Sequence, residues 1–363
     1  MVILSQPAAL SPAGNIKDFV ISSSEVVRFR LYKGETLLLD NQYQPDATGQ
    51  ITVSIKDVVL SSLSVELPAD NIHIQQNIAA DFVANISDVN VSFRAVRCGV
   101  ERWNGDISSF LWGNFLTWQP QLVETRYTQP QWLTYYNASD NQALLKVKFY
   151  LKDGSTSVIS VGTVAAGECI SFNTQFAHIW SLLDADKYGY YDVYVEDGSG
   201  VRLSYIQRYV LVDGSENDTL FIFENTLGGL DSVAFTGANT YAPEHTFGNV
   251  VYDECNSNAY IERAGAYSQN SGYKTKREAL WLRDFFVMPN RYVVKDGVIL
   301  PIVVDESSVS NSNMEQLHSF EFKYKLSDDS KYQNLARIET LAVPIESATP
   351  DNLFFFSSAP RGI

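Results

Sequence analysis

Hydrophobic positions in the first hundred residues alternate with polar ones in short runs. A period of two residues is typical of half-buried β-strands, and these runs predict strands over residues 18–21, 26–32, 36–43, 51–55, 82–86 and 91–96. Lys33-Gly34-Glu35 and Asp46-Ala47-Thr48-Gly49 have the composition of tight turns between such strands. We therefore predict a small antiparallel β-sandwich for residues 1–97.

The same period returns between residues 137 and 212. Leu145, Val147 and Phe149 alternate with more polar neighbours. Asp153-Gly154 and Asp197-Gly198 indicate hairpins, because Asp-Gly readily adopts the positive φ angles of a tight turn. Residues 176–186 can also hold a short helical turn. We predict a second β-sandwich, which forms one module over residues 98–213 together with an aromatic-rich connector.

A hairpin organises the third module, residues 214–363. Leu220–Phe223 is a continuous apolar run, as in a strand buried on both faces. Gly228-Gly229 then permits a sharp turn, in which we place Asp231 as an acid that binds nearby amides. The alternation of Val233 and Phe235 with smaller residues predicts a return strand with one buried face.

One helix is predicted after this hairpin. Thr275 and Glu278 have the spacing of a capping box, in which each side chain binds a free backbone amide of the first helical turn. Apolar residues then recur at three- and four-residue steps, as Ala279, Leu282, Phe285 and Phe286. Pro289 ends the helix, and strands follow over residues 292–295, 298–305 and 319–325.

These patterns together predict a mainly β fold of tandem β-sandwich-like modules. One short amphipathic helix is expected to pack on the C-terminal module. A length of 363 residues suits two or three domains, and the content of hydrophobic residues, 45%, is ample for their cores.

The connector between the first two β-sandwiches is unusually aromatic, since it holds four of the chain's six Trp residues. A flexible linker is normally polar, so we expect this segment to pack against something. It can be a wedge between domains, a protein–protein contact or a platform on which sugar rings stack. A run of three Phe residues near the C-terminus is also expected to dock on a protein surface. The interface candidates are therefore Trp103, Trp112, Phe115, Trp118, Trp132, Phe354, Phe355 and Phe356.

Charge and cysteine content narrow the range of partners. The net charge is −15 and no dense Lys/Arg cluster is present, so we expect no nucleic-acid partner. Residues 1–15 have no cationic residue and no long apolar core, so we expect neither a signal peptide nor a membrane anchor. Cys98, Cys169 and Cys255 are far apart in sequence, which favours reduced structural thiols.

No group of residues in the sequence points to a reaction. His73, His178, His245 and His318 are isolated, and CxxC, GxSxG and phosphate-loop motifs are absent, so we predict no catalytic residue, metal or cofactor. Two possibilities stay open. A pair of carboxylates can assemble from distant positions, with Asp231 as the first acid to test. Asp213, Asn217 and Asp218 could hold calcium, although their spacing does not fit a helical calcium loop.

Several stretches of the chain resemble a group of tail-associated proteins from prophages of gut bacteria. They are Phe-Glu-Asn-Thr-Leu-Gly-Gly-Leu-Asp at 223–231, Asn-Ser-Gly-Tyr at 270–273, Trp-Leu-Arg-Asp-Phe-Phe at 281–286, Arg-Tyr-Val at 291–293, Phe-Leu-Thr-Trp-Gln-Pro at 115–120 and Tyr-Ile-Gln-Arg-Tyr at 205–209. The resemblance covers most of residues 100–305. It implies a structural part of a virion or tail-like particle and supplies no catalytic residue.

The hypothesis is a non-enzymatic structural or adaptor protein of a phage-tail-like prophage assembly. It would act through contacts with its own copies, as a homo-oligomer, and with other tail or baseplate proteins. Synthesis in the cytoplasm without a signal peptide would be followed by assembly into the particle. One alternative is a carbohydrate-binding or adhesion module with a Trp/Tyr platform, and the other is a glycosidase that acts on capsule or cell wall.

Overall fold

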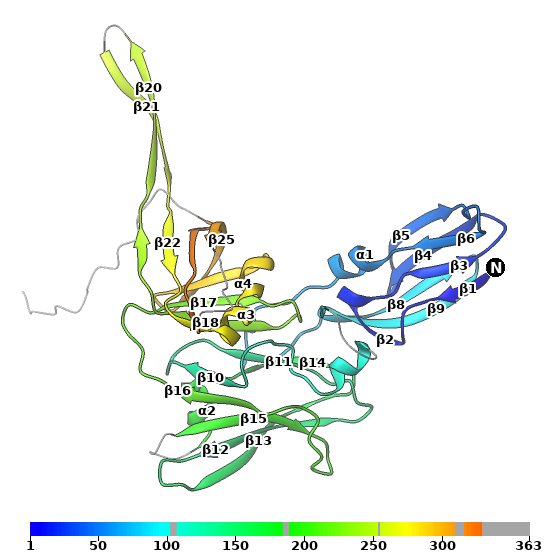
Figure 1. Ribbon diagram of the computed structural model, residues 1–363, viewed down its shortest axis with the longest axis horizontal. Coiled ribbons are helices and arrows are strands. Elements are labelled where there is room, and N and C mark those ends of the chain that lie inside the picture. Colours follow the sequence, from blue (N-terminus) through cyan, green and yellow to red (C-terminus); the bar gives the residue numbers. More distant parts are fainter. Residues whose placement is uncertain (102–106, 184–188, 253–254, 309–315, 329–363) are drawn as a thin grey trace, which may run out of the picture. The chain divides into compact units, whose positions relative to one another are not determined.

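The computed structural model describes residues 1–101, 107–183, 189–252, 255–308 and 316–328, and the chain is mainly β (Figure 1). Two compact units are present, one of residues 1–245 and 264–328 and the other of residues 246–263 and 329–363. Strands of the described residues form seven sheets, and the helices are short. The predicted class, tandem β-sandwich-like modules with a short helix in the C-terminal module, is confirmed.

The first module has two sheets around one hydrophobic core, ordered β1-β3-β6 and β2-β9-β8-β4-β5. The strands are β1 Val2–Ser5, β2 Leu10–Pro12, β3 Phe19–Ser22, β4 Val27–Lys33, β5 Thr36–Tyr43, β6 Gln50–Val53, β8 Ala79–Ile86 and β9 Val89–Val96, with the 3-10 helix η1 at Ala13–Asn15. Alternation along β4 places Phe29 and Leu31 in the core. The strand predicted over residues 51–55 ends at Val53, and an unpredicted helix, α1, follows at Lys56–Ser61.

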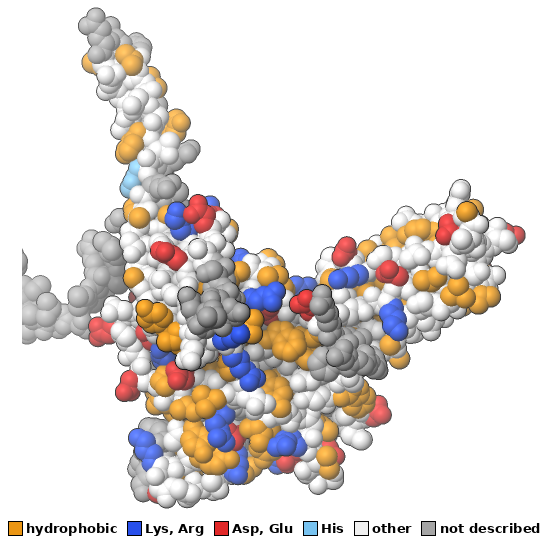
Figure 2. Space-filling view, viewed as in Figure 1, with side chains coloured by type: hydrophobic (Ala, Val, Ile, Leu, Met, Phe, Trp, Pro, Cys, Tyr) orange, Lys and Arg blue, Asp and Glu red, His pale blue; other side chains and the backbone are white. Residues whose placement is uncertain are grey.

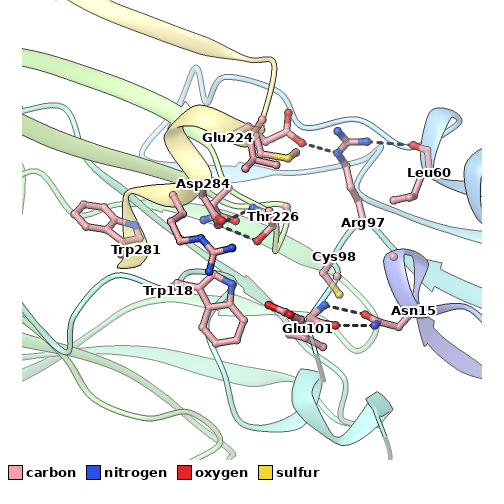
Figure 3. Close-up of a pocket in the computed structure, with 18 of the residues that line it drawn as sticks. Asn15, Leu60, Arg97, Cys98, Glu101, Trp118, Glu224, Thr226, Trp281 and Asp284 are labelled. Atoms are coloured by element: carbon pink, nitrogen blue, oxygen red, sulfur yellow. Dashed lines mark hydrogen bonds and ion pairs between the residues drawn. The ribbon is translucent and has the colours of Figure 1, made fainter. Parts of the chain in front are cut away.

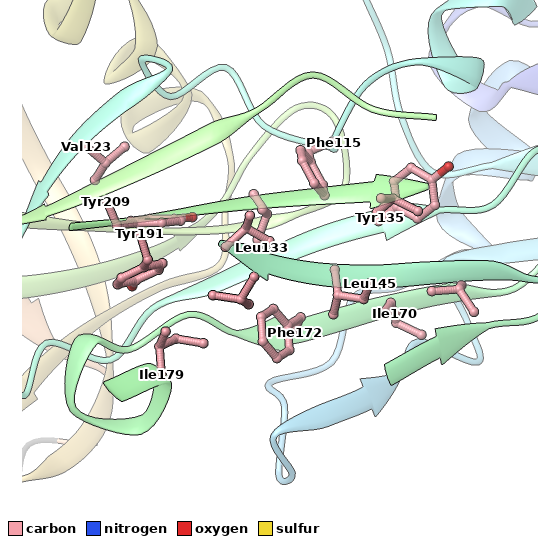
Figure 4. Close-up of a cluster of buried hydrophobic side chains, with 14 of the residues drawn as sticks. Phe115, Val123, Leu133, Tyr135, Leu145, Ile170, Phe172, Ile179, Tyr191 and Tyr209 are labelled. Atoms are coloured by element: carbon pink, nitrogen blue, oxygen red, sulfur yellow. The ribbon is translucent and has the colours of Figure 1, made fainter. Parts of the chain in front are cut away.

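The second module is also built from two sheets, ordered β11-β14-β7 and β10-β16-β15-β12-β13. Its strands are β7 Ile72–Ile74, β10 Leu122–Thr125, β11 Trp132–Tyr136, β12 Ala143–Tyr150, β13 Thr156–Val164, β14 Cys169–Asn173, β15 Tyr190–Glu196 and β16 Gln207–Leu211, with η2 at Ile107–Trp112 and α2 at Phe176–Ser181. Figure 4 shows side chains of both sheets meeting in one core. The alternation predicted for β12 is confirmed, since Leu145, Val147 and Phe149 are buried.

Strand β7 connects the first two modules. It follows the first β-sandwich's helix α1 in sequence, yet it pairs antiparallel with β14, where Ile74 lies opposite Ile170. Residues 72–74 thus belong to a sheet of the second module, although the predicted boundary at residue 97 places them in the first. The chain therefore enters the second module, returns to the first through β8 and β9, and leaves it again after Val96.

The third module is a seven-stranded sheet, ordered β18-β17-β24-β25-β27-β22-β19, with two short helices against it. Its elements are β17 Thr219–Glu224, β18 Leu230–Phe235, β19 Asn239–Tyr241, β22 Tyr267–Asn270, β23 Lys274–Thr275, α3 Lys276–Trp281, α4 Arg283–Val287, β24 Arg291–Lys295, β25 Val298–Ser308, β26 Leu317–His318 and β27 Glu321–Leu326. The helix predicted from the capping box is thus two consecutive helices, because the chain is not α-helical at Leu282.

The hairpin of β17 and β18 is buried on both faces. One face, which includes Phe221 and Phe235, packs on α3 and α4. The other face, which includes Ile222 and Leu230, packs against Trp132 of the second module. The predicted one-sided burial of β18 is wrong, because the second module covers the face that a lone sheet would expose to water.

The second unit contains most of a two-stranded ribbon formed by β20 Glu244–Tyr252 and β21 Cys255–Ala264. Several of its apolar side chains are exposed, among them Phe247, Val250, Val251 and Tyr260. A two-stranded ribbon by itself is marginally stable in water. Residues 354–356, for which docking was predicted, lie outside the described residues.

Phe221 provides a test of how much the hydrophobic core of the third module contributes to stability. Its ring centroid lies 5.2 to 5.6 Å from those of four other aromatic rings, Phe235, Phe285, Phe322 and Tyr324. We expect Phe221→Ala to lower the free energy of unfolding by about 3–5 kcal/mol, because it leaves a cavity among these rings. Urea denaturation followed by circular dichroism measures this loss. The exposed control Tyr273→Ala should change it by less than about 0.5 kcal/mol.

Candidate functional site

The turn between β17 and β18, residues 225–229, is held by the side chain of Asn225. Its Oδ1 accepts hydrogen bonds from the backbone N–H groups of Leu227, at 3.0 Å, and Gly229, at 2.9 Å. Its Nδ2 donates to the carbonyl of Leu116 in the second module, at 2.9 Å. Asn225 is fully buried, so one amide side chain both shapes the turn and attaches it to the second module.

The two glycines of this turn are required by close backbone contacts. Gly228 has a φ of +81°, and a Cβ placed there would lie 1.9 Å from the carbonyl oxygen of Arg97. A Cβ on Gly229 would lie 2.1 Å from the carbonyl oxygen of Leu116. The turn predicted from these glycines is present, and its glycines also let the first and second modules approach it.

A buried ion pair joins the first module to the third. Arg97 Nε donates to Glu224 Oε1 at 2.6 Å, and Asn290 donates to the other carboxylate oxygen at 2.6 Å. Arg97 Nη1 also donates to the carbonyl of Leu60 at 3.1 Å (Figure 3) and to that of Leu63 at 2.9 Å. The Glu224 side chain is inaccessible to water, so its charge depends on these partners.

Backbone hydrogen bonds also connect the first and third modules. We define the joint as residues 97–100 together with residues 224–229. Gly99 N–H donates to the carbonyl of Thr226 at 3.0 Å. Asn15 of the first module binds both the N–H and the carbonyl of Val100, at 2.8 and 2.7 Å. Leu227 fills an apolar cluster whose other buried members are Ile78, Val96, Cys98, Val100, Phe110, Leu111, Leu116, Tyr136 and Cys169.

A groove with a volume of about 1160 Å³ lies beside the joint. Arg97, Glu224 and Asp284 line its inner side, and Trp118 and α3 line it as well (Figure 3). Asp284 Oδ2 accepts from both the N–H and the hydroxyl of Thr226, each at 2.9 Å. Burial raises the pKa of Asp284, whereas these bonds lower it.

Asp231 lies in strand β18 and not in the turn where the sequence placed it. The reason is that the turn ends at Gly229, so Asp231 points into the interior, where it is 1% exposed. The indole N–H of Trp281 donates to its Oδ2 at 2.7 Å. Burial raises the pKa of Asp231 to about 7, and the Trp281 bond opposes this shift.

Two acids that line the groove are thus engaged in structural bonds. Glu224 is paired with Arg97, and Asp284 is bound to Thr226. Among the described residues, no three His, Cys, Asp or Glu side chains are grouped closely enough to hold a metal ion. Asp218, one of the residues considered for calcium, pairs instead with Arg126 at 2.8 Å. No helix in the described ranges is long and apolar enough to cross a membrane.

The aromatic interface candidates occupy different environments. Trp112 and Trp118 are 51% and 40% exposed. Phe115 and Trp132 are buried in the chain's own cores, because they pack between sheets, so they are not part of its accessible surface. Trp103, Phe354, Phe355 and Phe356 lie outside the described residues.

The capping box is present at the start of α3. Thr275 Oγ1 accepts from the N–H of Glu278 at 3.3 Å, and the Glu278 carboxylate accepts from the N–H of Thr275 at 2.8 Å. Sequence reasoning found this cap and the glycine turn. It missed Arg97 and Glu224, which are 127 residues apart. Only the isolated position of Glu224 at the end of an apolar run hinted at a buried partner.

Comparisons with known proteins identify no family for this chain. No protein-family model matches it, and no curated protein does. Among solved structures, a chain from the tail of an empty GTA particle, computed with helical refinement in C6 symmetry, is 14% identical, with a TM-score of 0.24 over 34% of this chain and 100% of that chain. The full extracellular region of plexin A4 is 8% identical, with a TM-score of 0.17 over 90% of this chain and 39% of that one. Both similarities are weak.

The glycine turn can be tested with a matched pair of variants. Gly228→Ala should lower the free energy of unfolding by about 3 kcal/mol or more, because the new Cβ meets the Arg97 carbonyl. Gly154 has a similar φ, +86°, but open space around it, so Gly154→Ala should cost only about 1–2 kcal/mol. Denaturant titration compares the two. Equal losses would show that the Arg97 contact does not restrict this position.

Asp231 predicts a pH dependence of stability. Because its pKa is about 7 in the folded chain and 3.8 ordinarily, the folded state keeps a proton that the unfolded state has released. This contribution is complete below about pH 4 and is lost as pH rises through 7, by up to about 4 kcal/mol. Asp231→Asn should remove this slope in unfolding free energies measured from pH 4 to 8. Exposed Asp70→Asn should retain the slope, and an unchanged slope in Asp231→Asn would contradict the assignment.

Proposed function

We propose that this chain is a non-enzymatic structural or adaptor protein of a phage-tail-like assembly, and that it acts through protein–protein contacts. The observation that carries the proposal is the joint, in which the buried Arg97–Glu224 pair connects two modules. A buried charged pair that holds β modules together is more typical of a structural part that transmits load than of a catalytic site. The resemblance of residues 223–231 to prophage tail-associated proteins supports the same role, because this segment forms most of the joint.

A sugar-binding platform is the second candidate. It is favoured by Trp112 and Trp118, whose indoles are substantially exposed and can offer ring faces for stacking. A glycan array probed with the full chain tests it, with Trp112→Ala and Trp118→Ala as variants. The glycosidase alternative has less support, because Glu224 and Asp284 already accept structural hydrogen bonds.

Particle association is the direct test of the structural role. In cells that carry the gene, we expect the protein to sediment with tail-like particles after lysis and to stay with them after a high-salt wash. Deletion of the gene should yield incomplete particles, and a plasmid copy should restore them. Light scattering of the purified chain should give a mass above the 40.6 kDa of one copy.

Two results would contradict this role. One is a protein that remains entirely outside the particle fraction while particles of the deletion strain are complete. The other is a hydrolytic activity on capsule or cell wall that disappears when a single acid of the groove is replaced by its amide.

A further inference from the structure

The groove beside the joint has an exposed apolar wall. Leu280 of α3 and Val287 of α4 are 52% and 67% exposed, although the opposite faces of both helices are buried in the third core. Trp118 lines the same groove. On the face drawn in Figure 2, hydrophobic and basic side chains adjoin each other near these helices. Apolar side chains gathered at one hollow are typical of a docking surface.

The same wall carries positive charge. Arg277 and Leu280 lie one turn apart on α3, and Arg283 and Val287 lie one turn apart on α4. Arg277, Arg283 and Lys56 of α1 line the groove and form no ion pair with a residue that the structure describes. These cations outnumber Asp57 and Glu101, the two carboxylates of the lining for which no ion pair with a described residue is found. The groove therefore favours an occupant that is both acidic and apolar.

One segment of this chain has that composition. Residues 346–356 contain Glu346 and Asp351 and no basic residue, and they end in Leu353 followed by Phe354-Phe355-Phe356. They lie outside the described residues. Three successive Phe side chains are costly to leave in water, and the groove offers them the exposed faces of Leu280, Val287 and Trp118. Carboxylates of the segment complement the arginines of α3 and α4.

We propose that the groove binds residues 346–356 of a second copy of this chain. The choice of a second copy rests on the proposed structural role, since repeated assemblies are built from such contacts. Each copy would donate its segment to the groove of the next, a head-to-tail contact that closes into a ring or extends into a filament. The chain from Asp328 to Phe354 can span up to about 85 Å when extended, enough to reach a neighbour. Pockets for drug-sized ligands are about 300–1,000 Å³, so this groove has room for several side chains.

Cross-linking between two tagged preparations of the full chain tests the contact. Both carry Cys255→Ser, which removes the exposed thiol and leaves the buried Cys98 and Cys169. One carries Val287→Cys and a first tag, and the other carries Ser357→Cys and a second tag. Mild oxidation of the mixture should give a disulfide-linked product that holds both tags. Val298→Cys, at an exposed position outside the groove lining, is the matched control and should give none.

Charge reversal distinguishes binding in the groove from nonspecific association of the two chains. Arg277→Glu with Arg283→Glu should reduce the mixed product to the level of the Val298→Cys control. Lys276→Glu, on the same helix but outside the groove lining, should leave the yield unchanged. Circular dichroism of each variant establishes that the chain is folded before its yield is compared.

Two outcomes would overturn the contact. They are the absence of a product that holds both tags, and a yield of that product that does not respond to Arg277→Glu with Arg283→Glu. The proposed function is tested separately, by whether the protein sediments with tail-like particles. Normal incorporation without the cross-link refutes this contact alone, whereas a cross-link in a protein that never joins particles refutes the tail-like role alone.

Discussion

The arrangement of the three modules depends on the buried pair between Arg97 and Glu224. A carboxylate with no exposed surface is strongly destabilising unless its charge is compensated, and here Arg97 and Asn290 together bind both of its oxygens. Arg97 in turn reaches two carbonyls beside α1. A buried pair of this kind is weak evidence for net stability, but it restricts how the first module docks on the third, because losing these partners would leave the Glu224 carboxylate buried and uncompensated.

The turn of residues 225–229 makes this docking possible. Its glycines let the carbonyls of Arg97 and Leu116 approach to distances that any Cβ would prevent. Asn225 then fixes the turn from within, and Leu227 adds apolar area from the turn to a cluster that the first two modules share. Hydrogen bonds define the geometry of the joint. Burial of the apolar cluster supplies much of the free energy that stabilises the joint.

The groove has an inner side of hydrogen-bonded carboxylates and an outer side of exposed side chains. Its inner carboxylates, on Glu224 and Asp284, accept hydrogen bonds from Arg97 and Thr226, whereas the outer stripe of α3 and α4 has exposed apolar side chains beside arginines that form no ion pair with a described residue. Helices whose inner faces are fixed in an aromatic core hold such a stripe in a constant shape.

Local chemistry was sufficient for strands such as β4, β5 and β12, for the glycine turn and for the Thr275–Glu278 cap, because each depends on residues a few positions apart. The partners of Glu224, the pairing of β7 with β14 and the burial of Asp231 could not be foreseen from these patterns. They arise only when whole sheets meet, since a period of two tells which residues share a face and not what will cover that face. The groove likewise exists only after the joint has formed.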